Sequence, residues 1–388
     1  MDFPPMPPST VFGNKYEPLR RFDMRDWLQP RRMTAVMWDH AFLTRHVKGD
    51  SFEDYDRVLD EAIERGYNTL RIDPVPQSID LSRPEIDFTQ TMNIPYLPWT
   101  RPTGFQGRAG EWLIEFMEKV IDRKLYYALS SWWGGGIQPT RHDPHTLVEA
   151  TECWIDFLTQ WKSRFGFDGC AYVDLNNEFP CFLPGMMGYL EKEGGPSWSA
   201  KWQQVVTQQI NDSMGIMRKE FPELKFMVSL HGDVRYTQLE LELDCMDIHF
   251  YSDADPRWHQ RTQFYAFCPK MFTSTDWHAE YSIRTAKSNK ASAAMYRARQ
   301  RAKVGEFAAM SDARGIPLLT TESWAAWYCI DSPEMDWSWL LEWAEWSVED
   351  AIDYRMWGWT PHNYVQPQFE NWKDVRWHQR LTDRFLRS

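Results

Sequence analysis

The chain has no long apolar stretch and no dense basic cluster, and these absences exclude several classes of protein. Its 388 residues contain no window of about eighteen apolar residues, the length a membrane helix needs. The start, MDFPP, lacks the basic and apolar regions of a secretory signal, which favours the cytoplasm unless a signal was trimmed. A net charge of −12 argues against nucleic acid as a partner, because phosphate binding needs clustered lysine and arginine.

Cysteine and histidine are sparse and show no redox or metal-binding spacing. The six cysteines form no C-x-x-C pair, so reduced thiols packed as small hydrophobic groups are the simplest interpretation. Four histidines lack the H-x-x-x-H and H-x-H spacings of metal ligands, namely His231, His249, His259 and His278. A metallohydrolase is therefore the weaker enzyme alternative, and we expect no metal and no organic cofactor.

Aromatic residues, in contrast, are abundant, with 22 Trp, 22 Phe and 16 Tyr. Such side chains can simply fill the core, but tryptophan faces also stack on the apolar faces of sugars. We interpret any single Trp as a core residue and clusters on loops as sugar-binding surfaces. Trp132, in the glycine-rich turn that follows a predicted strand, belongs to the second group.

The order of apolar and amphipathic segments predicts eight strand–helix alternations without a break in composition. The expected strands are 33–38, 67–74, 125–131, 171–175, 225–231, 245–251, 316–321 and 354–359. The expected helices are 52–65 capped by Ser51, 110–124, 143–162, 198–221, 292–314, 337–350 and 373–386. This pattern predicts a single (β/α)8 TIM barrel over residues 31–388, after an irregular lead-in at 1–30, with long loops at the carboxyl ends of the strands.

Two of the predicted strands each deliver a glutamate at the carboxyl end. Glu178 follows the fourth strand and Glu322 ends the seventh. Cleavage of a sugar acetal needs one carboxyl to protonate the leaving oxygen and another to stabilise or attack the anomeric carbon. We expect a raised pKa for the acid, from apolar walls and the second carboxylate, and an ionised nucleophile favoured by Arg71 and Tyr251.

Four motifs follow one another along the chain: Arg71 in the second strand, Asn177-Glu178 after the fourth, His249-x-Tyr251 in the sixth and Glu322-Ser323-Trp324 at the end of the seventh. Taken in this order, they resemble the motifs of clan A retaining glycoside hydrolases, most closely those of the family 5 cellulase-like group. The resemblance covers about residues 33–385. One departure is Asn-Glu-Phe-Pro where Asn-Glu-Pro is usual, which places Phe179 in the turn after the acid.

The resemblance implies roles for individual residues. Glu178 would be the acid/base and Glu322 the nucleophile, and Asn177 would hydrogen-bond the sugar 2-hydroxyl. His249 and Tyr251 would orient the two glutamates.

Five further positions are expected near the sugar, and one of them is Trp324 at the end of the seventh strand. The same resemblance implies that a Trp at the exit of the eighth strand, either Trp357 or Trp359, forms the floor of the first sugar subsite. Asp39 and His40, after the first strand, are candidate ligands of sugar hydroxyls and equally plausible loop-capping residues.

We therefore expect a retaining β-glycoside hydrolase that acts on oligosaccharides or glycosides by double displacement, with carbohydrate as its partner. Two alternatives remain open. One is a carbohydrate-binding barrel without catalysis, whose glutamates only hold sugar hydroxyls. The other is an endo-acting hydrolase of polysaccharides, of the cellulase or mannanase type.

Overall fold

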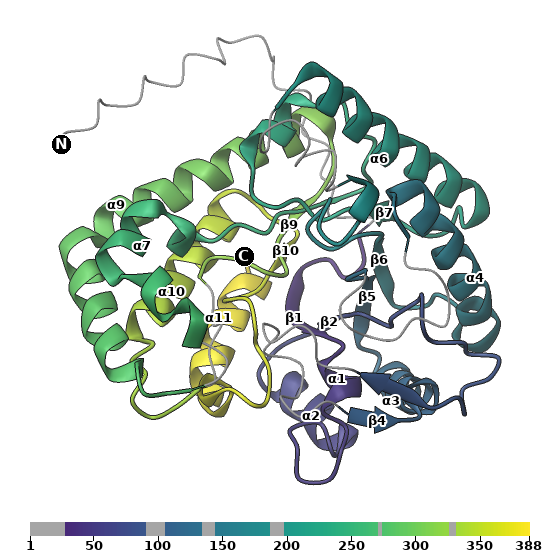
Figure 1. Ribbon diagram of the computed structural model, residues 1–388, viewed down its shortest axis with the longest axis horizontal. Coiled ribbons are helices and arrows are strands. Elements are labelled where there is room, and N and C mark those ends of the chain that lie inside the picture. The colour runs from purple at the N-terminus through teal and green to yellow at the C-terminus, as the bar shows by residue number, and fades with distance from the viewer. Residues whose placement is uncertain (1–27, 91–104, 134–143, 187–197, 271–273, 326–330) are drawn as a thin grey trace.

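The fold is built on eight parallel strands. The computed structural model describes residues 28–90, 105–133, 144–186, 198–270, 274–325 and 331–388 (Figure 1). The strands are β1 (Met33–Asp39), β2 (Thr69–Ile72), β5 (Tyr126–Ser130), β6 (Cys170–Asp174), β7 (Phe226–Met227), β8 (Met246–Asp247), β9 (Leu318–Leu319) and β10 (Gly358–Trp359). Their order in the sheet is β7-β6-β5-β2-β1-β10-β9-β8, and every pairing between them is parallel.

The two edge strands of this sheet meet just beyond their carboxyl ends. Leu230, after β7, forms a parallel bridge with Ile248, after β8, and a second one with Phe179. These bridges bring the first and last strands of the order together, so the sheet curves into a barrel. All seven residues of β1 are buried, as expected for a strand enclosed by a ring of helices. The predicted (β/α)8 barrel is confirmed.

Amphipathic helices surround the strands (Figure 1). The main ones are α2 (Tyr55–Glu64), α3 (Ala109–Asp122), α4 (Leu147–Phe165), α6 (Ala200–Glu220), α9 (His278–Arg314), α10 (Ser338–Asp353) and α11 (Val375–Leu386). In α2 the buried residues recur at helical spacing, and they are Tyr55, Val58, Leu59 and Ala62. The N-cap of α2 is Asp54, whose carboxylate accepts the backbone N–H of Arg57. The expected cap, Ser51, instead bonds Asp50.

The largest difference from the predicted elements lies between the sixth and seventh barrel strands. The helix expected at 292–314 begins at His278 and kinks at Ser292. Two short helices precede it, α7 (Pro256–Thr262) and α8 (Phe264–Phe267). An antiparallel hairpin of β3 (Phe88–Gln90) and β4 (Phe105–Gly107) was also not predicted. These short elements have too few residues to show a period in the sequence.

Much of the aromatic content lies in the core. Trp258 of α7 packs against Trp339 and Trp343 of α10, with ring centroids 4.5 and 4.9 Å apart. All three side chains are buried, so this cluster fixes α7 to the barrel and is not a sugar-stacking surface. Among the described residues, no disulfide involves the four cysteines Cys153, Cys170, Cys181 and Cys245. The predicted lead-in up to residue 27 and the turn at Gly134–Gly136 lie outside the described residues.

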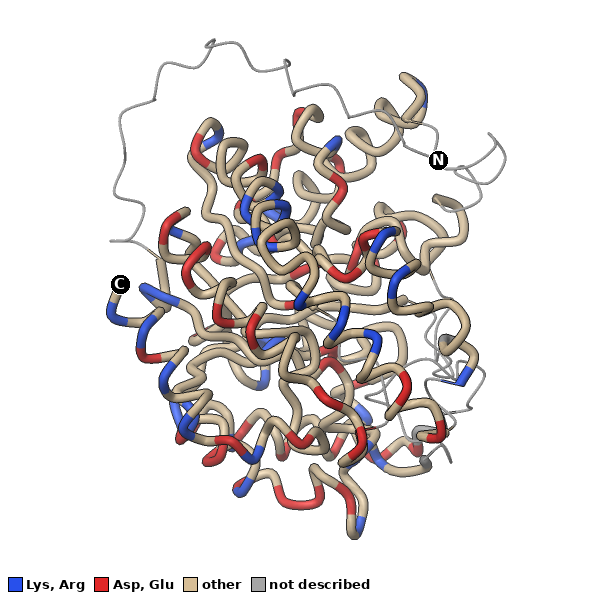
Figure 2. Tube along the Cα trace, turned by 90° about the vertical axis from the view of Figure 1, so that its left-hand side faces the viewer, with Lys and Arg blue, Asp and Glu red and all other residues tan. Residues whose placement is uncertain are grey.

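Acidic and basic residues alternate along the outer helices in Figure 2. Lys119 and Arg123 of α3, for example, pair with Asp56 and Asp60 of α2. Solvent screens such exposed pairs, so they contribute little to stability. Among the described helices, none combines the length and the apolar character that crossing a membrane requires.

Candidate active site

Glu178 lies in a tight turn directly after β6. Its backbone has a positive φ of 50°, a conformation that is strained for a residue with a side chain. Ser229, after β7, holds this turn, because its hydroxyl accepts the N–H of Glu178 at 2.8 Å and its carbonyl accepts that of Phe179 at 3.0 Å. The extra Phe179 is buried, and its carbonyl accepts the hydroxyl of Tyr236. The turn therefore fixes Glu178 at the carboxyl end of the barrel.

Glu322 lies across the mouth, after β9, with only 3% of its side chain exposed. The hydroxyl of Tyr251 donates to its Oε1 at 2.5 Å. Tyr251 also forms a parallel bridge with Trp324, which joins the exits of β8 and β9. Glu322 is thus oriented by a neighbouring strand end, as the sequence motif predicts.

His249 lies between the two carboxylates. Its Nδ1 is 3.5 Å from Oε1 of Glu178 and 3.4 Å from Oε2 of Glu322, while its Nε2 is 3.5 Å from Asp247. These are ion contacts, longer than good hydrogen bonds. One carboxylate oxygen of each glutamate and a ring nitrogen of His249 all lie within 4.8 Å of one another. Residues 144 positions apart in the chain therefore share one buried centre.

Arg71, in the middle of β2, is completely buried among acids. Its guanidinium donates to Asp39 at 2.9 Å and to Asn177, and lies 3.4 Å from Asp174 and 3.8 Å from Glu322. Burial opposes its charge, but these carboxylates outweigh burial and raise the pKa of Arg71 above its ordinary value. The arginine is the cation that holds the acidic strand ends together.

The two glutamates differ in proton affinity, in the direction opposite to the sequence expectation. Burial, together with the charge of Glu178, raises the pKa of Glu322 to about 8. Burial would also raise the pKa of Glu178, but His249 and His231 hold it below its ordinary value. Burial opposes the charge of His249 as well, yet the surrounding carboxylates raise its pKa to about 10. At neutral pH these directions favour one proton on the pair of carboxyls, held more tightly by Glu322 than by Glu178.

The protonated state of His249 also bears on metal binding. Glu178, His249 and Glu322 offer three donor atoms close enough for one ion. A ring nitrogen that carries a proton has no lone pair to give to a metal, so this set is better suited to moving protons than to holding a cation.

The residues after β1 form a second buried layer beside this centre. Asp39, with a φ of 42°, accepts the indole N–H of Trp132 at 2.9 Å in addition to Arg71. Trp132 also donates its backbone N–H to Asp73, which lies 4.0 Å from the ring of His40. Burial lowers the pKa of His40 to about 3, so its ring is neutral. Asp39 and Trp132 therefore reach the arginine cluster, whereas His40 lies behind them.

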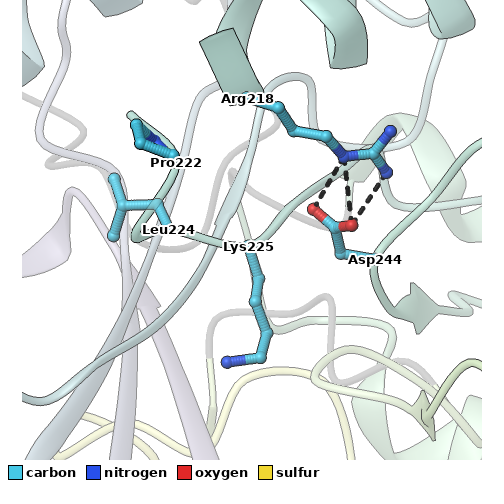
Figure 3. Close-up of a pocket in the computed structure, with 5 residues that line it drawn as sticks. All are labelled: Arg218, Pro222, Leu224, Lys225 and Asp244. Atoms are coloured by element: carbon cyan, nitrogen blue, oxygen red, sulfur yellow. Dashed lines mark hydrogen bonds and ion pairs between the residues drawn. The ribbon is translucent and has the colours of Figure 1, made fainter. Parts of the chain in front are cut away.

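A surface pocket exists at the opposite end of the barrel (Figure 3). It is lined by residues that precede β7 and β8, namely Arg218, Pro222, Leu224, Lys225 and Asp244. Arg218 and Asp244 neutralise each other there at 2.8 Å. In parallel barrels chemistry takes place at the carboxyl ends of the strands, so this pocket is not the site.

The model of the sugar-binding cellulase-like family matches residues 35–386. The chain belongs to this family. A crystal structure of a "putative glycoside hydrolase" from Parabacteroides distasonis ATCC 8503 superposes with a TM-score of 0.77 at 25% identity, over 91% of this chain and 93% of that one. No curated protein matches the sequence.

Two more distant structures share the fold of this cellulase-like chain. An endocellulase from Pyrococcus horikoshii, in complex with cellotetraose, has a TM-score of 0.51 at 12% identity, covering 91% of this chain and 93% of that one. Cellulose synthase subunit Z from Clostridioides difficile has a TM-score of 0.50 at 12% identity, covering 92% and 99%. At these identities the likeness concerns the fold alone.

Three tryptophans predicted near the sugar lie elsewhere in this cellulase-like barrel. Trp359 points outward, where its indole N–H donates to Ser347 of α10. Trp357 donates to the carbonyl of Pro30, before β1, and so lies at the amino end of the barrel. Trp324 is fully buried and donates to the carbonyl of Thr360. The expectation that Trp357 or Trp359 floors the first subsite therefore disagrees with their positions.

Several polar residues of the site are not predicted by the sequence motifs. Asp174 and Ser130 bind Arg71 from neighbouring strands, and Asp247 supports His249. His231 contacts Glu178 at 3.7 Å. The sequence feature that could have indicated them is an Asp or Ser at the end of an apolar strand. This feature is common in proteins, so a single occurrence does not predict a functional residue.

Proposed function

We propose that the protein is a retaining β-glycoside hydrolase, with Glu322 as nucleophile and Glu178 as acid/base. The observation that carries this proposal is the closeness of the two carboxylates, which have oxygens within 4.8 Å of one another at the barrel mouth. Retaining enzymes hold their carboxyls about 5–5.5 Å apart, whereas inverting enzymes need about 6.5–9.5 Å to admit a water molecule. Membership of the sugar-binding cellulase-like family supports a carbohydrate substrate.

The surrounding residues suit this chemistry. Among the described residues, the Nδ2 of Asn177 is buried without a hydrogen-bond partner, whereas its Oδ1 accepts from Arg71. An unpaired buried donor is costly unless a ligand accepts from it, and a sugar 2-hydroxyl can do so. Tyr251 holds Glu322 by its Oε1, so Oε2 is left to approach the anomeric carbon.

In the first step, Oε2 of Glu322 attacks the anomeric carbon as the bond to the leaving oxygen breaks, and Glu178 gives that oxygen its proton. Water, deprotonated by Glu178, then displaces Glu322. Before sugar binds, Glu322 is the carboxyl with the higher proton affinity. Bound sugar changes this, because positive charge that develops at the anomeric carbon favours ionised Glu322, while loss of solvent favours protonated Glu178.

The direct test is a panel of aryl β- and α-glycosides, together with oligosaccharides and soluble β-glucans. We expect cleavage of one or more β-glycosides, with the first-formed sugar in the β configuration by proton NMR. An α product from a β substrate would show inversion and overturn the mechanism. Binding of sugars without turnover of any substrate would favour the carbohydrate-binding barrel.

The dependence of kcat/KM on pH provides a second test. Below the lowered pKa of Glu178 both carboxyls are protonated, which leaves no nucleophile. Above a pH of about 8 both are ionised, which leaves no acid. The profile should therefore be bell-shaped, with its alkaline limb near pH 8 and its acid limb below the ordinary glutamate pKa of 4.5. An alkaline limb below pH 6 would contradict the proton affinity described for the pair.

A further inference from the structure

The two oxygens of Glu178 face different surroundings. Oε1 points into the buried centre, 3.5 Å from His249. Oε2 lies 3.7 Å from Nε2 of His231, whose side chain is 60% exposed. An acid must protonate a leaving group that then departs into solvent, so Oε2, the oxygen beside the exposed His231, is the one suited to this transfer. His231 therefore lies on the side where the leaving group enters and departs.

The backbone around His231 holds the ring in this place. Leu230, just before it, is bridged to both neighbouring strand exits. Gly232, just after it, has a φ of +53°, and a Cβ there would lie 2.4 Å from the Cβ of Phe250 and 2.7 Å from the carbonyl oxygen of His249. Only glycine fits such a position without displacing its neighbours. The exposed ring is thus carried by a rigid, closely packed strand end.

We propose that His231 forms one wall of the leaving-group subsite, where its Nε2 contacts the departing sugar and keeps Oε2 of Glu178 turned toward the scissile oxygen. The charged or titratable groups around Glu178 are His231, His249, Arg71, Glu322 and Cys181. Of these, His231 is the one with a mostly exposed side chain. Its contact would therefore matter most when the leaving group is a sugar that needs both a proton and a binding partner.

This inference rests on the proposed function, and the test compares two leaving groups on one glycone. The substrates are a disaccharide and the 2,4-dinitrophenyl glycoside, whose leaving group needs no proton. We expect His231→Ala to lower kcat/KM for the disaccharide roughly tenfold or more, the effect of losing a hydrogen bond near a charged group. The dinitrophenyl substrate should change less than about threefold, because no proton transfer limits its cleavage. His231→Gln keeps a donor and should recover part of the loss.

The matched control is His145→Ala, since His145 is also exposed but lies just before α4, where its backbone N–H donates to Glu149. It should leave both substrates unchanged, and the thermal midpoint of each variant shows whether it is folded. Equal losses on both substrates, or no loss on either, would overturn the role of His231. If the unaltered protein cleaves neither substrate nor any glycoside of the panel, the proposed function itself fails.

Discussion

Replacing Glu322 with alanine is expected to lower kcat for a β-glycoside by roughly 10⁴-fold or more, the scale of removing a nucleophile from a group of residues that act together. The physical reason is that no other carboxylate in the described site can reach the anomeric carbon from the same side. Glu178 is proposed as the acid/base, and Asp39 and Asp174 are bound to Arg71. Steady-state kinetics on the best substrate of the panel measures the loss.

Azide distinguishes the two glutamates after their removal. In Glu322→Ala, azide occupies the space of the nucleophile and should yield the α-glycosyl azide from a β substrate. In Glu178→Ala, the glycosyl-enzyme still forms from an activated substrate, and azide should displace it to give the β-glycosyl azide. The opposite result would exchange the two roles.

Glu240→Ala is a suitable control for these variants, because the side chain of Glu240 is 95% exposed. It should retain full activity.

The stability of Glu322→Gln adds a readout that does not depend on turnover. A buried carboxyl with a pKa near 8 costs folding energy when it ionises at higher pH, so the neutral variant should unfold at an equal or higher temperature.

The barrel and the two glutamates could be predicted because their signals are local. Each strand is a short apolar run, and each glutamate follows its strand directly, as Asn177-Glu178 and Glu322-Ser323 show. A parallel barrel then places both at one mouth whatever their separation in the chain. Arg71 could be predicted from its place in the middle of a buried strand, where an arginine needs acidic partners, and the neighbouring strand ends supply them.

The features that could not be predicted depend on side-chain direction and on the sum of many charges. The side chain of Trp359 can face the mouth or the helices. It faces the helices, where its indole N–H donates to Ser347 and its ring packs against Phe385. The raised pKa of Glu322 likewise depends on several causes acting together: burial, the neighbouring carboxylate of Glu178, and the opposing charges of a histidine and an arginine. The position of His231 depends on the turn at Gly232, whose conformation the sequence does not reveal.

Substitution of Arg71 by methionine should cause the largest loss of stability. The side chain is completely buried, and its removal leaves Asp39, Asp174 and Glu322 without their shared cation. Breaking a buried ion pair from one side costs about 3–5 kcal/mol, because the remaining charge is desolvated and unpaired. Urea unfolding at pH 7.5 should show a decrease of this size in the free energy of unfolding.

The decrease should become smaller at pH 5. Burial already raises the pKa values of Asp39 and Glu322, and without the arginine they should rise further, so the folded state binds more protons than the unfolded chain. Stability gained in this way is present at low pH and is lost as the pH rises through the folded pKa values. A loss that grows on acidification would contradict this account.

Arg218→Met provides the matched control, since Arg218 also pairs with an aspartate, Asp244, but its side chain is 33% exposed at the other end of the barrel (Figure 3). Solvent screens that pair, so its loss should cost no more than about 1 kcal/mol and should depend little on pH. A similar cost for both variants would mean that Arg71 is an ordinary ion pair. A much larger, pH-dependent cost for Arg71 alone would identify it as the residue that keeps the acidic mouth of the barrel folded.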